Sequence, residues 1–243
     1  MLYSQEFTAF VRNGVDDYYV GIGNPNAPIL FVGKESYFSP DSVKEMEEYK
    51  SNAKTWLDRI DRNVEDIYEY PVDENHVLRK GWGKNTWSKY QLLSNQICQV
   101  TPQRFFVNFL HNVFTTEIND SPSPNTSNAD KTGLSKRKEL FKSSSFIQKF
   151  PLVVLACSDY IDNVNANEIN DIFGVQYDGP EKGENRYSKG NWFFTHHSAD
   201  GRKLVIHTRQ LSANVNGKML DDMGNVIRVH LEHLSLKCRI PKI

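Results

Sequence analysis

The sequence predicts an α/β protein, specifically a three-layer α/β/α sandwich with a central, mainly parallel sheet of about four strands. Two apolar runs, residues 27–33 (APILFVG) and residues 151–158 (PLVVLACS), are short and continuous, which is typical of strands buried on both faces. Segments with helical periodicity lie between the apolar runs. Strands that alternate with helices pair in parallel, and the helices then cover both faces of the sheet.

Several segments predict the helices of the two outer layers. Residues 41–61 begin with Asp41 and Ser42, which can cap a helix, and they carry a broken apolar face. Residues 85–99 repeat apolar side chains at spacings of three and four, so Tyr90 belongs to a stripe that faces the core. Further helices are predicted for residues 134–150, 165–174 and most of 214–233.

Two further strand segments complete the predicted sheet. Residues 113–118 are aromatic and β-branched, and residues 192–208 form a hairpin-like pair whose second arm begins at Lys203. The polar run 119–133 is rich in Ser, Pro and Asn and predicts a loop. Without internal repeats, the chain predicts a single domain over residues 1–243. We expect its core at about residues 25–215 and a C-terminal helical extension at residues 216–243.

Composition and charge restrict the class of protein. The formal net charge is −1, so the chain lacks a global positive field that would attract nucleic acid or an anionic membrane. Cys98, Cys157 and Cys238 form an odd set without a close pair, which argues against a disulfide framework and fits a reducing compartment. The N-terminal segment is too polar for a secretory signal, and no apolar stretch approaches the ~20 residues of a bilayer span. We therefore expect a monomeric cytoplasmic protein that uses no cofactor and contacts no membrane.

Polar clusters follow three of the predicted strands. They are residues 33–38 (GKESYF), 115–120 (TTEIND) and 207–212 (HTRQLS). Ligands of open α/β sheets bind outside the carboxyl ends of the strands, where these clusters would meet. The sequence therefore predicts a functional site at this edge, with Glu35 and His207 facing one shared cavity.

The three clusters, in this order, resemble the motifs of the uracil-DNA glycosylase superfamily. The first is similar to its Gly-Gln-Asp-Pro-Tyr-His turn, with Gly33, Glu35 and Tyr37 at the matching positions. The last is similar to its His-Pro-Ser-Pro-Leu-Ser loop, in which His207 and Leu211 match. The resemblance covers about residues 25–215 and implies a uracil-DNA glycosylase-like fold, DNA or another nucleic acid as partner, and a hydrolase of DNA repair.

The resemblance also implies roles for individual residues. Glu35 would position the attacking water, His207 would face the leaving base, and Glu117 would recognise the base where well-known members use an asparagine. Substrate contacts are further implied for Gly33, Tyr37, Phe38, Arg209, Leu211 and Ser212. Tyr37 and Phe38 would form the walls of a planar pocket. Arg209 and Lys34 would contact phosphates, and Leu211 would fill the gap that a flipped base leaves.

Several positions depart from the family's motifs, and two of them affect the chemistry. Breaking an N-glycosidic bond needs a carboxylate that positions water and offsets the positive sugar, and Glu35 is one methylene longer than the family's aspartate. An ionised Glu117 accepts hydrogen bonds only, so it suits a base with an exocyclic amino group unless it is protonated. We therefore predict that uracil is not the preferred substrate. The other departures are Ser36, Thr208 and Gln210 in place of prolines, Arg209 in place of a serine, and Phe38 in place of a histidine.

Two functions stay open from the sequence. The first is a divergent DNA glycosylase that hydrolyses the N-glycosidic bond of a flipped nucleobase. The second is a non-catalytic descendant of the same fold that binds nucleic acid, a nucleotide or a protein, which the near-neutral charge and the missing prolines favour.

A metal site at residues 196–200 (HHSAD) is the less favoured interpretation of the histidine-rich segment. His196 and His197 are adjacent, so their side chains would leave an extended strand on opposite faces. Asp200 and Gly201 are typical of a hairpin turn. We therefore predict no metal.

Overall fold

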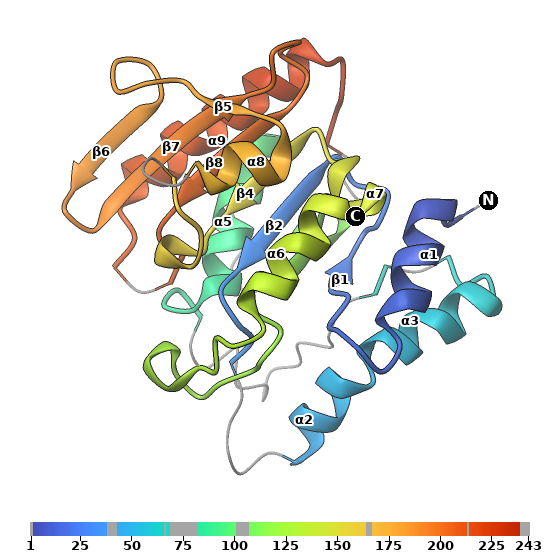
Figure 1. The fold of residues 1–243 in the computed structure, drawn as a ribbon. Coiled ribbons are helices and arrows are strands. Elements are labelled where there is room, and N and C mark those ends of the chain that lie inside the picture. The colour runs from blue at the N-terminus through green and yellow to red at the C-terminus, as the bar shows by residue number, and fades with distance from the viewer. Residues whose placement is uncertain are drawn as a thin grey trace.

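A mixed sheet forms the centre of the molecule (Figure 1). The computed structural model describes residues 2–37, 43–65, 67–68, 82–100, 107–163, 167–212 and 214–238. Its strands are β1 (Ile22–Gly23), β2 (Ile29–Gly33), β3 (Val113–Glu117), β4 (Leu152–Leu155), β5 (Gln176–Tyr177), β6 (Glu184–Ser188), β7 (Asn191–His197) and β8 (Leu204–Thr208). The strand order is β1-β3-β2-β4-β8-β7-β5, and β6 pairs with β7.

The four strands β3-β2-β4-β8 are the parallel part of this sheet. The other strands, β1, β5, β6 and β7, pair antiparallel. The α/β class is therefore confirmed, whereas the prediction of a mainly parallel sheet of about four strands is wrong. In the described residues the sheet has eight strands, because a short strand is added at β3 and a three-stranded antiparallel unit is added at β8.

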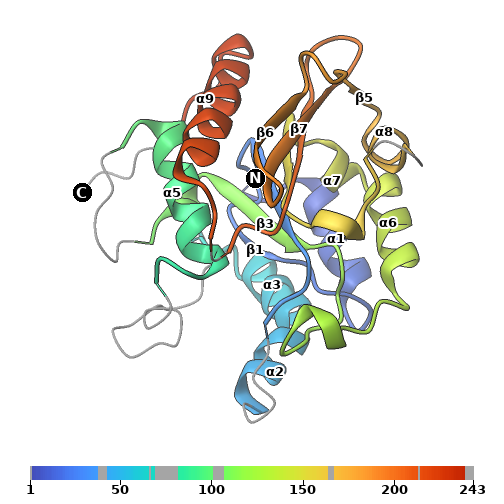
Figure 2. The ribbon, with the colours of Figure 1, turned by 90° about the vertical axis from the view of Figure 1, so that its left-hand side faces the viewer.

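Helices cover both faces of the sheet, as Figure 2 shows. They are α1 (Gln5–Gly14), α2 (Val43–Lys50), α3 (Asn52–Asp61), α5 (Thr86–Cys98), α6 (Leu134–Ser143), α7 (Ser145–Gln148), α8 (Glu168–Phe173) and α9 (Gly217–His233). One hydrophobic cluster joins α1, α3, α6, α7 and α8 to one face, and a second joins α5 and α9 to the other. The central strands β2 and β4 are buried throughout because both faces are covered.

Two predicted helices are each divided by a serine. Residues 41–61 were expected as one helix, but α2 ends at Lys50 and α3 begins at Asn52, with Ser51 between them. The expected caps Asp41 and Ser42 lie outside the described residues. The predicted helix 134–150 breaks at Ser144, whose side chain accepts a hydrogen bond from the Ile147 amide and so begins a new helix.

Helix α9 belongs to the core, although residues 216–243 were expected as an extension. It lies along α5, and Met219, Met223 and Ile227 are fully buried in the second cluster. Gly224 permits this close approach, because a Cβ there would lie 2.6 Å from Cβ of Gln96 on α5. With α1 in the other cluster, the core extends beyond residues 25–215 at both ends.

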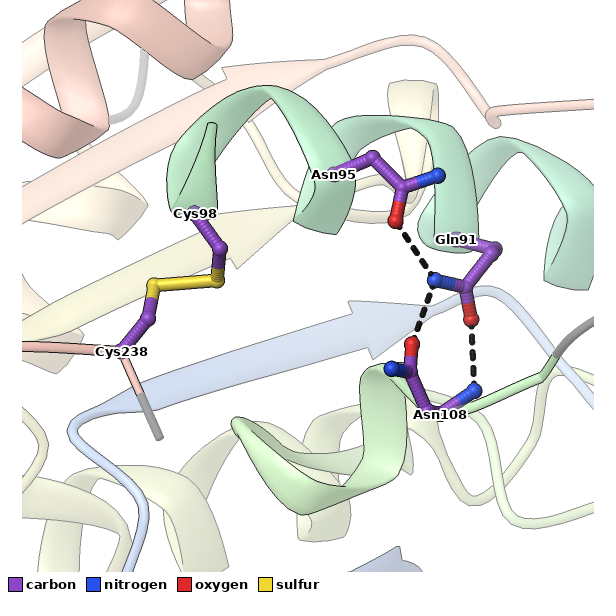
Figure 3. Close-up of a disulfide and its surroundings, with 5 residues drawn as sticks. All are labelled: Gln91, Asn95, Cys98, Asn108 and Cys238. Carbon is purple, nitrogen blue, oxygen red and sulfur yellow. Dashed lines mark hydrogen bonds between the residues drawn. A yellow bond between two sulfur atoms is a disulfide. The ribbon is translucent and has the colours of Figure 1, made fainter. Parts of the chain in front are cut away.

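Cys98 and Cys238 form a disulfide, which contradicts the expectation of unpaired cysteines (Figure 3). They are 140 residues apart in sequence, but the packing of α9 on α5 brings their Cα atoms to 5.6 Å. Cys157 is free and buried. Because two of the three cysteines are paired, the cysteines no longer support a reducing compartment.

No helix of the described segments combines the length and the apolar character needed to cross a membrane.

Candidate active site

The carboxyl ends of β2 and β3 bring two predicted site residues together. Gly33 pairs with Glu117 in the parallel register of the two strands. The pairing continues past the strand ends, because the Ile118 amide donates to the Gly33 carbonyl at 3.0 Å and the Asn119 amide donates to the Lys34 carbonyl at 2.8 Å. Glu35 follows at once, so the two carboxyl groups share one edge of the sheet.

Gly33 allows the Glu117 carboxyl group to lie directly against β2. A Cβ at position 33 would be only 2.1 Å from Oε2 of Glu117. The glycine is therefore required by this close approach, and a larger residue would displace the carboxyl group.

The environment of Glu117 favours its neutral form. The residue is partly exposed, but its Oε2 is buried and accepts no hydrogen bond from the described residues. Burial, and then the charge of Glu35, raise the pKa of Glu117 from 4.5 to about 8, and Arg137 opposes this only in part. Glu117 is therefore mostly protonated at neutral pH.

Arg137 of α6 holds the end of β3 from the opposite side of the sheet. It is buried, its Nε donates to the Glu117 carbonyl at 3.0 Å, and its Nη2 donates to Tyr19 O and Thr116 Oγ1. The guanidinium thus binds the backbone rather than the carboxylate of Glu117, so it fixes the strand end without forming an ion pair there.

Glu35 is held by the long polar loop. Its Oε1 accepts a hydrogen bond from Thr126 Oγ1 at 2.7 Å, and its Oε2 is buried without a partner among the described residues. The loop stays near this segment because the Ser123 amide donates to the Ser36 carbonyl at 3.0 Å. One oxygen of the carboxylate is therefore fixed, and the other has no hydrogen-bond partner among the described residues.

Tyr160 closes the other side of the Glu35 carboxylate. Burial and the neighbouring Glu35 raise the pKa of the Tyr160 hydroxyl. The ammonium groups of Lys34 and Lys131 each lie 4.6 Å from the centre of its ring. Lys34 is buried and forms an ion pair with Asp159 at 2.7 Å, so it is not free to contact a phosphate as expected.

Tyr90 lies beneath Glu117. It is buried in the core, as its helical spacing predicts, and its hydroxyl has no hydrogen-bond partner among the described residues. Burial, together with Glu117, keeps the pKa of Tyr90 well above 10. A neutral Tyr90 hydroxyl is therefore a second proton donor near the carboxyl pair.

His207 does not join the two carboxyl groups, contrary to the expectation. It is 4% exposed, its Nε2 lies 2.8 Å from the Ser158 carbonyl, and Trp192 and Phe194 pack against its ring. Burial lowers the pKa of His207 to about 4, so the imidazole is neutral. These contacts leave it no access to a leaving base.

Strand alternation explains why His207 and Glu117 separate. Val205 belongs to the cluster on the α6 face, so His207 also points to that face, whereas Phe31 and therefore Gly33 and Glu117 face α5. Their strands are also three strand spacings apart in the order β3-β2-β4-β8, roughly 14 Å at ~4.8 Å each. Glu117 and His207 therefore do not face a common cavity, and the burial of His207 leaves its imidazole without an opening toward Glu35.

The remaining predicted contacts scatter around this edge. Leu211 is fully buried against the α5 and α9 cluster, which contradicts its role as an exposed wedge. Arg209 donates to the carbonyls of Gly190 and Gln210. Tyr37 is 66% exposed beside Glu35, and Ser212 is partly exposed. Phe38 lies outside the described residues.

Each histidine of the hairpin has one ring nitrogen in contact with the protein itself, and His196 Nε2 is buried without a partner among the described residues. His196 is buried, with Nδ1 3.3 Å from the Val205 carbonyl, and His197 Nδ1 lies 2.7 Å from Asp178 Oδ2. In the part of the chain that the structure describes, no three His, Cys, Asp or Glu side chains are grouped so that they could hold a metal ion.

Sequence reasoning missed three contributors to the site: Thr126, Arg137 and Tyr160. Thr126 lies in the run 119–133, which predicts a loop, and Arg137 lies in the predicted helix at residues 134–150. Tyr160 follows β4, so a fourth cluster at the carboxyl edge, residues 158–162 (SDYID), was the signal that could have revealed it.

The chain matches no known protein-family model, and no curated protein shows significant similarity to it.

Proposed function

We propose that the protein is a hydrolase that cleaves the N-glycosidic bond of a nucleobase, with Glu35 and Glu117 as its catalytic carboxyl groups. The observation that carries the proposal is the pair itself. Two carboxyl groups share one edge of the sheet, and burial and the charge of Glu35 raise the pKa of Glu117. A carboxyl group whose pKa is raised by its environment can serve as an acid at neutral pH.

Glu35 is proposed as the charged partner. One of its oxygens is fixed by Thr126, and the other accepts a hydrogen bond from the attacking water. The carboxylate also offsets the positive charge that develops on the sugar when the base leaves.

Glu117 replaces His207 as the proposed donor to the leaving base. A protonated carboxyl group both donates and accepts hydrogen bonds, as an asparagine amide does, so it can read a base that an ionised glutamate would reject. The buried His207 has no part in this mechanism.

A uracil-DNA glycosylase-like fold is part of the proposal. It is supported by the order of the motifs in the sequence and by the parallel strands β3-β2-β4-β8, whose carboxyl edge carries the carboxyl pair. The exposed Tyr37 beside Glu35 offers a ring on which a base of DNA or another nucleic acid can stack. The protein would act as a monomer.

Base release from oligonucleotides tests this function. Single- and double-stranded oligonucleotides that each carry one uracil, deaminated purine or alkylated base are incubated with the protein, and abasic sites are detected by alkaline cleavage. We expect release of a nucleobase other than uracil. The rate of release should fall by about 100-fold or more in Glu35→Gln, because the carboxylate that positions the attacking water is removed.

Glu139→Gln is the matched control, because Glu139 is an exposed glutamate on α6 away from the site. It is expected to keep the wild-type rate. The same background signal from wild type, Glu35→Gln and Glu139→Gln on every oligonucleotide would remove the catalytic function.

A non-catalytic binding protein is the second candidate, and the burial of Leu211 and His207 favours it. Without an exposed wedge, the chain has less to offer for holding a duplex open after a base is flipped. If no base release is detected, the binding function is tested by measuring the affinity for labelled single- and double-stranded DNA over a range of salt concentrations. Affinity that falls steeply with salt indicates phosphate contacts and supports a nucleic-acid-binding role.

A further inference from the structure

A cavity of about 620 Å³ lies at the other end of the sheet, remote from the carboxyl pair. Its walls are the residues before β4, the turn between β7 and β8, the end of α8 and the segment after α9. Since β4 and β8 are parallel, this is the amino-terminal edge of the sheet, whereas Glu35 and Glu117 follow the carboxyl ends of β2 and β3. The volume falls in the range of cavities that hold small organic molecules.

Positive charge predominates in the lining. Lys149, Arg202 and Lys203 contribute three cations against the single carboxylate of Asp200. That carboxylate accepts hydrogen bonds from the Ser198 hydroxyl and the Arg202 amide, so it serves the hairpin turn. The cavity therefore has an excess of cationic groups.

Lys203 is partly buried and Lys149 is exposed, and neither lysine forms an ion pair with an acidic side chain of the described residues. The charges of Glu6 and Asp200 act on Lys149 and Lys203, respectively, only at longer range. Lys203 Nζ donates to the carbonyl and Oε1 of Gln148 at 2.8 and 2.9 Å, and Lys149 Nζ donates only to Ser4 Oγ, at 3.5 Å. Burial lowers the pKa of both side chains. An anion beside them would restore the stabilisation that their charges lose on leaving water.

The same cavity has an apolar wall. Leu234 and Leu236 of the segment after α9 line it and are only partly buried. The Cys98–Cys238 disulfide ties this segment to α5, which keeps the wall in place. A ligand that suits the cavity therefore carries both a negative charge and an apolar part.

We propose that this cavity is a binding site for a small organic anion, a carboxylate or phosphate joined to an apolar group. The anion contacts Lys149 and Arg202, and the apolar group packs against Leu234 and Leu236. The site is separate from the carboxyl pair, so it does not depend on the proposed hydrolase function.

Calorimetric titration with two probes of similar shape and opposite charge tests the proposal. Naphthalene-2-sulfonate is the anionic probe, and naphthalen-2-ylmethylammonium is the cationic control. We expect saturable one-site binding of the sulfonate and none of the ammonium, with amide chemical-shift changes confined to the cavity, including Gly174 and Gly201. Glu35→Gln is expected to leave this binding unchanged.

Charge reversal in the lining is the second arm. Lys149→Glu and Arg202→Glu are each expected to weaken sulfonate binding by about tenfold or more, because a repulsive charge replaces an attractive one. The Lys149 side chain packs on Phe146, so Lys149→Glu could fail to fold. Arg202 is exposed on a turn, so Arg202→Glu tests the site in that case as well. Lys182→Glu makes the same charge change on an exposed turn elsewhere and is the matched control.

The proposal is overturned if the sulfonate does not saturate, if the ammonium binds as tightly, or if Arg202→Glu binds the sulfonate as well as Lys182→Glu does.

Discussion

At the scale of single residues, the position of the Glu117 carboxyl group decides the chemistry of the site. It lies where a side chain at position 33 would otherwise be, and burial makes its charged form costly. The predicted strands already placed Glu35 and Glu117 at one edge of the sheet, because parallel strands end together. They could not reveal that the pKa of Glu117 is raised, since that depends on the loss of water around the group and on the nearby charge of Glu35.

Glu117 makes the stability of the protein depend on pH. Its pKa is raised in the folded state, so the unfolded chain releases the proton first as pH increases. The contribution of the neutral form is fully present below about pH 4.5 and is lost as pH rises to about 8. The total loss is at most on the order of 5 kcal/mol, because one pKa unit corresponds to about 1.4 kcal/mol.

Glu117→Gln removes this dependence and is expected to be more stable than wild type at about pH 9, with little difference at about pH 4. Urea unfolding at both pH values measures the effect. A stability difference between Glu117→Gln and wild type that does not change with pH would contradict the protonation of Glu117.

Gly33→Ala tests the close approach of the same carboxyl group. The added Cβ would meet Oε2 of Glu117 at 2.1 Å, so the glutamate must move. We expect a loss of roughly 1–3 kcal/mol in the free energy of unfolding, as in overpacked cores. Base release should also fall, whereas Gly217→Ala, at an open position at the start of α9, should keep the wild-type rate. Wild-type stability and activity in Gly33→Ala would show that the two strands are not in this contact.

At the scale of elements, single serines and glycines explain why some helices differ from their prediction. Ser144 begins α7 inside what apolar periodicity presents as one helix, because periodicity does not register a side-chain cap. A glycine is unfavourable inside a helix, yet Gly224 lies inside α9 and lets that helix contact α5. Its role depends on a neighbour that is remote in sequence.

The contact between α5 and α9 also explains the disulfide, which cysteine spacing alone did not predict. We expect Cys98→Ser to lower the free energy of unfolding by roughly 2–5 kcal/mol, the usual cost of losing a native disulfide. A reductant should reproduce the effect in wild type and leave Cys98→Ser unchanged, and Cys157→Ser is the control for a cysteine outside the bond. If reductant does not change the midpoint of wild-type unfolding, the bond does not restrain the fold.

At the scale of the whole molecule, the parallel strands and the two helical layers followed from the sequence because continuous apolar runs and helical periodicity are strong signals. The short strands β1 and β5 contain two residues each and give no such signal. The expected cavity of Glu35 and His207 failed for a different reason. The motifs indicate which strands end together, but the face that each side chain takes depends on strand alternation, which turns His207 away from Glu117.

The central claim is that the Glu117 carboxyl group is protonated at neutral pH beside Glu35. Carbon-13 NMR of the glutamate side-chain carboxyl groups, followed from about pH 3 to pH 10 and assigned with Glu117→Gln, measures this directly. We predict that the Glu117 signal titrates near pH 8 and moves to a lower pH in Glu35→Gln, where the neighbouring charge is removed. A Glu117 signal that titrates below about pH 5, close to an ordinary glutamate, would contradict the account.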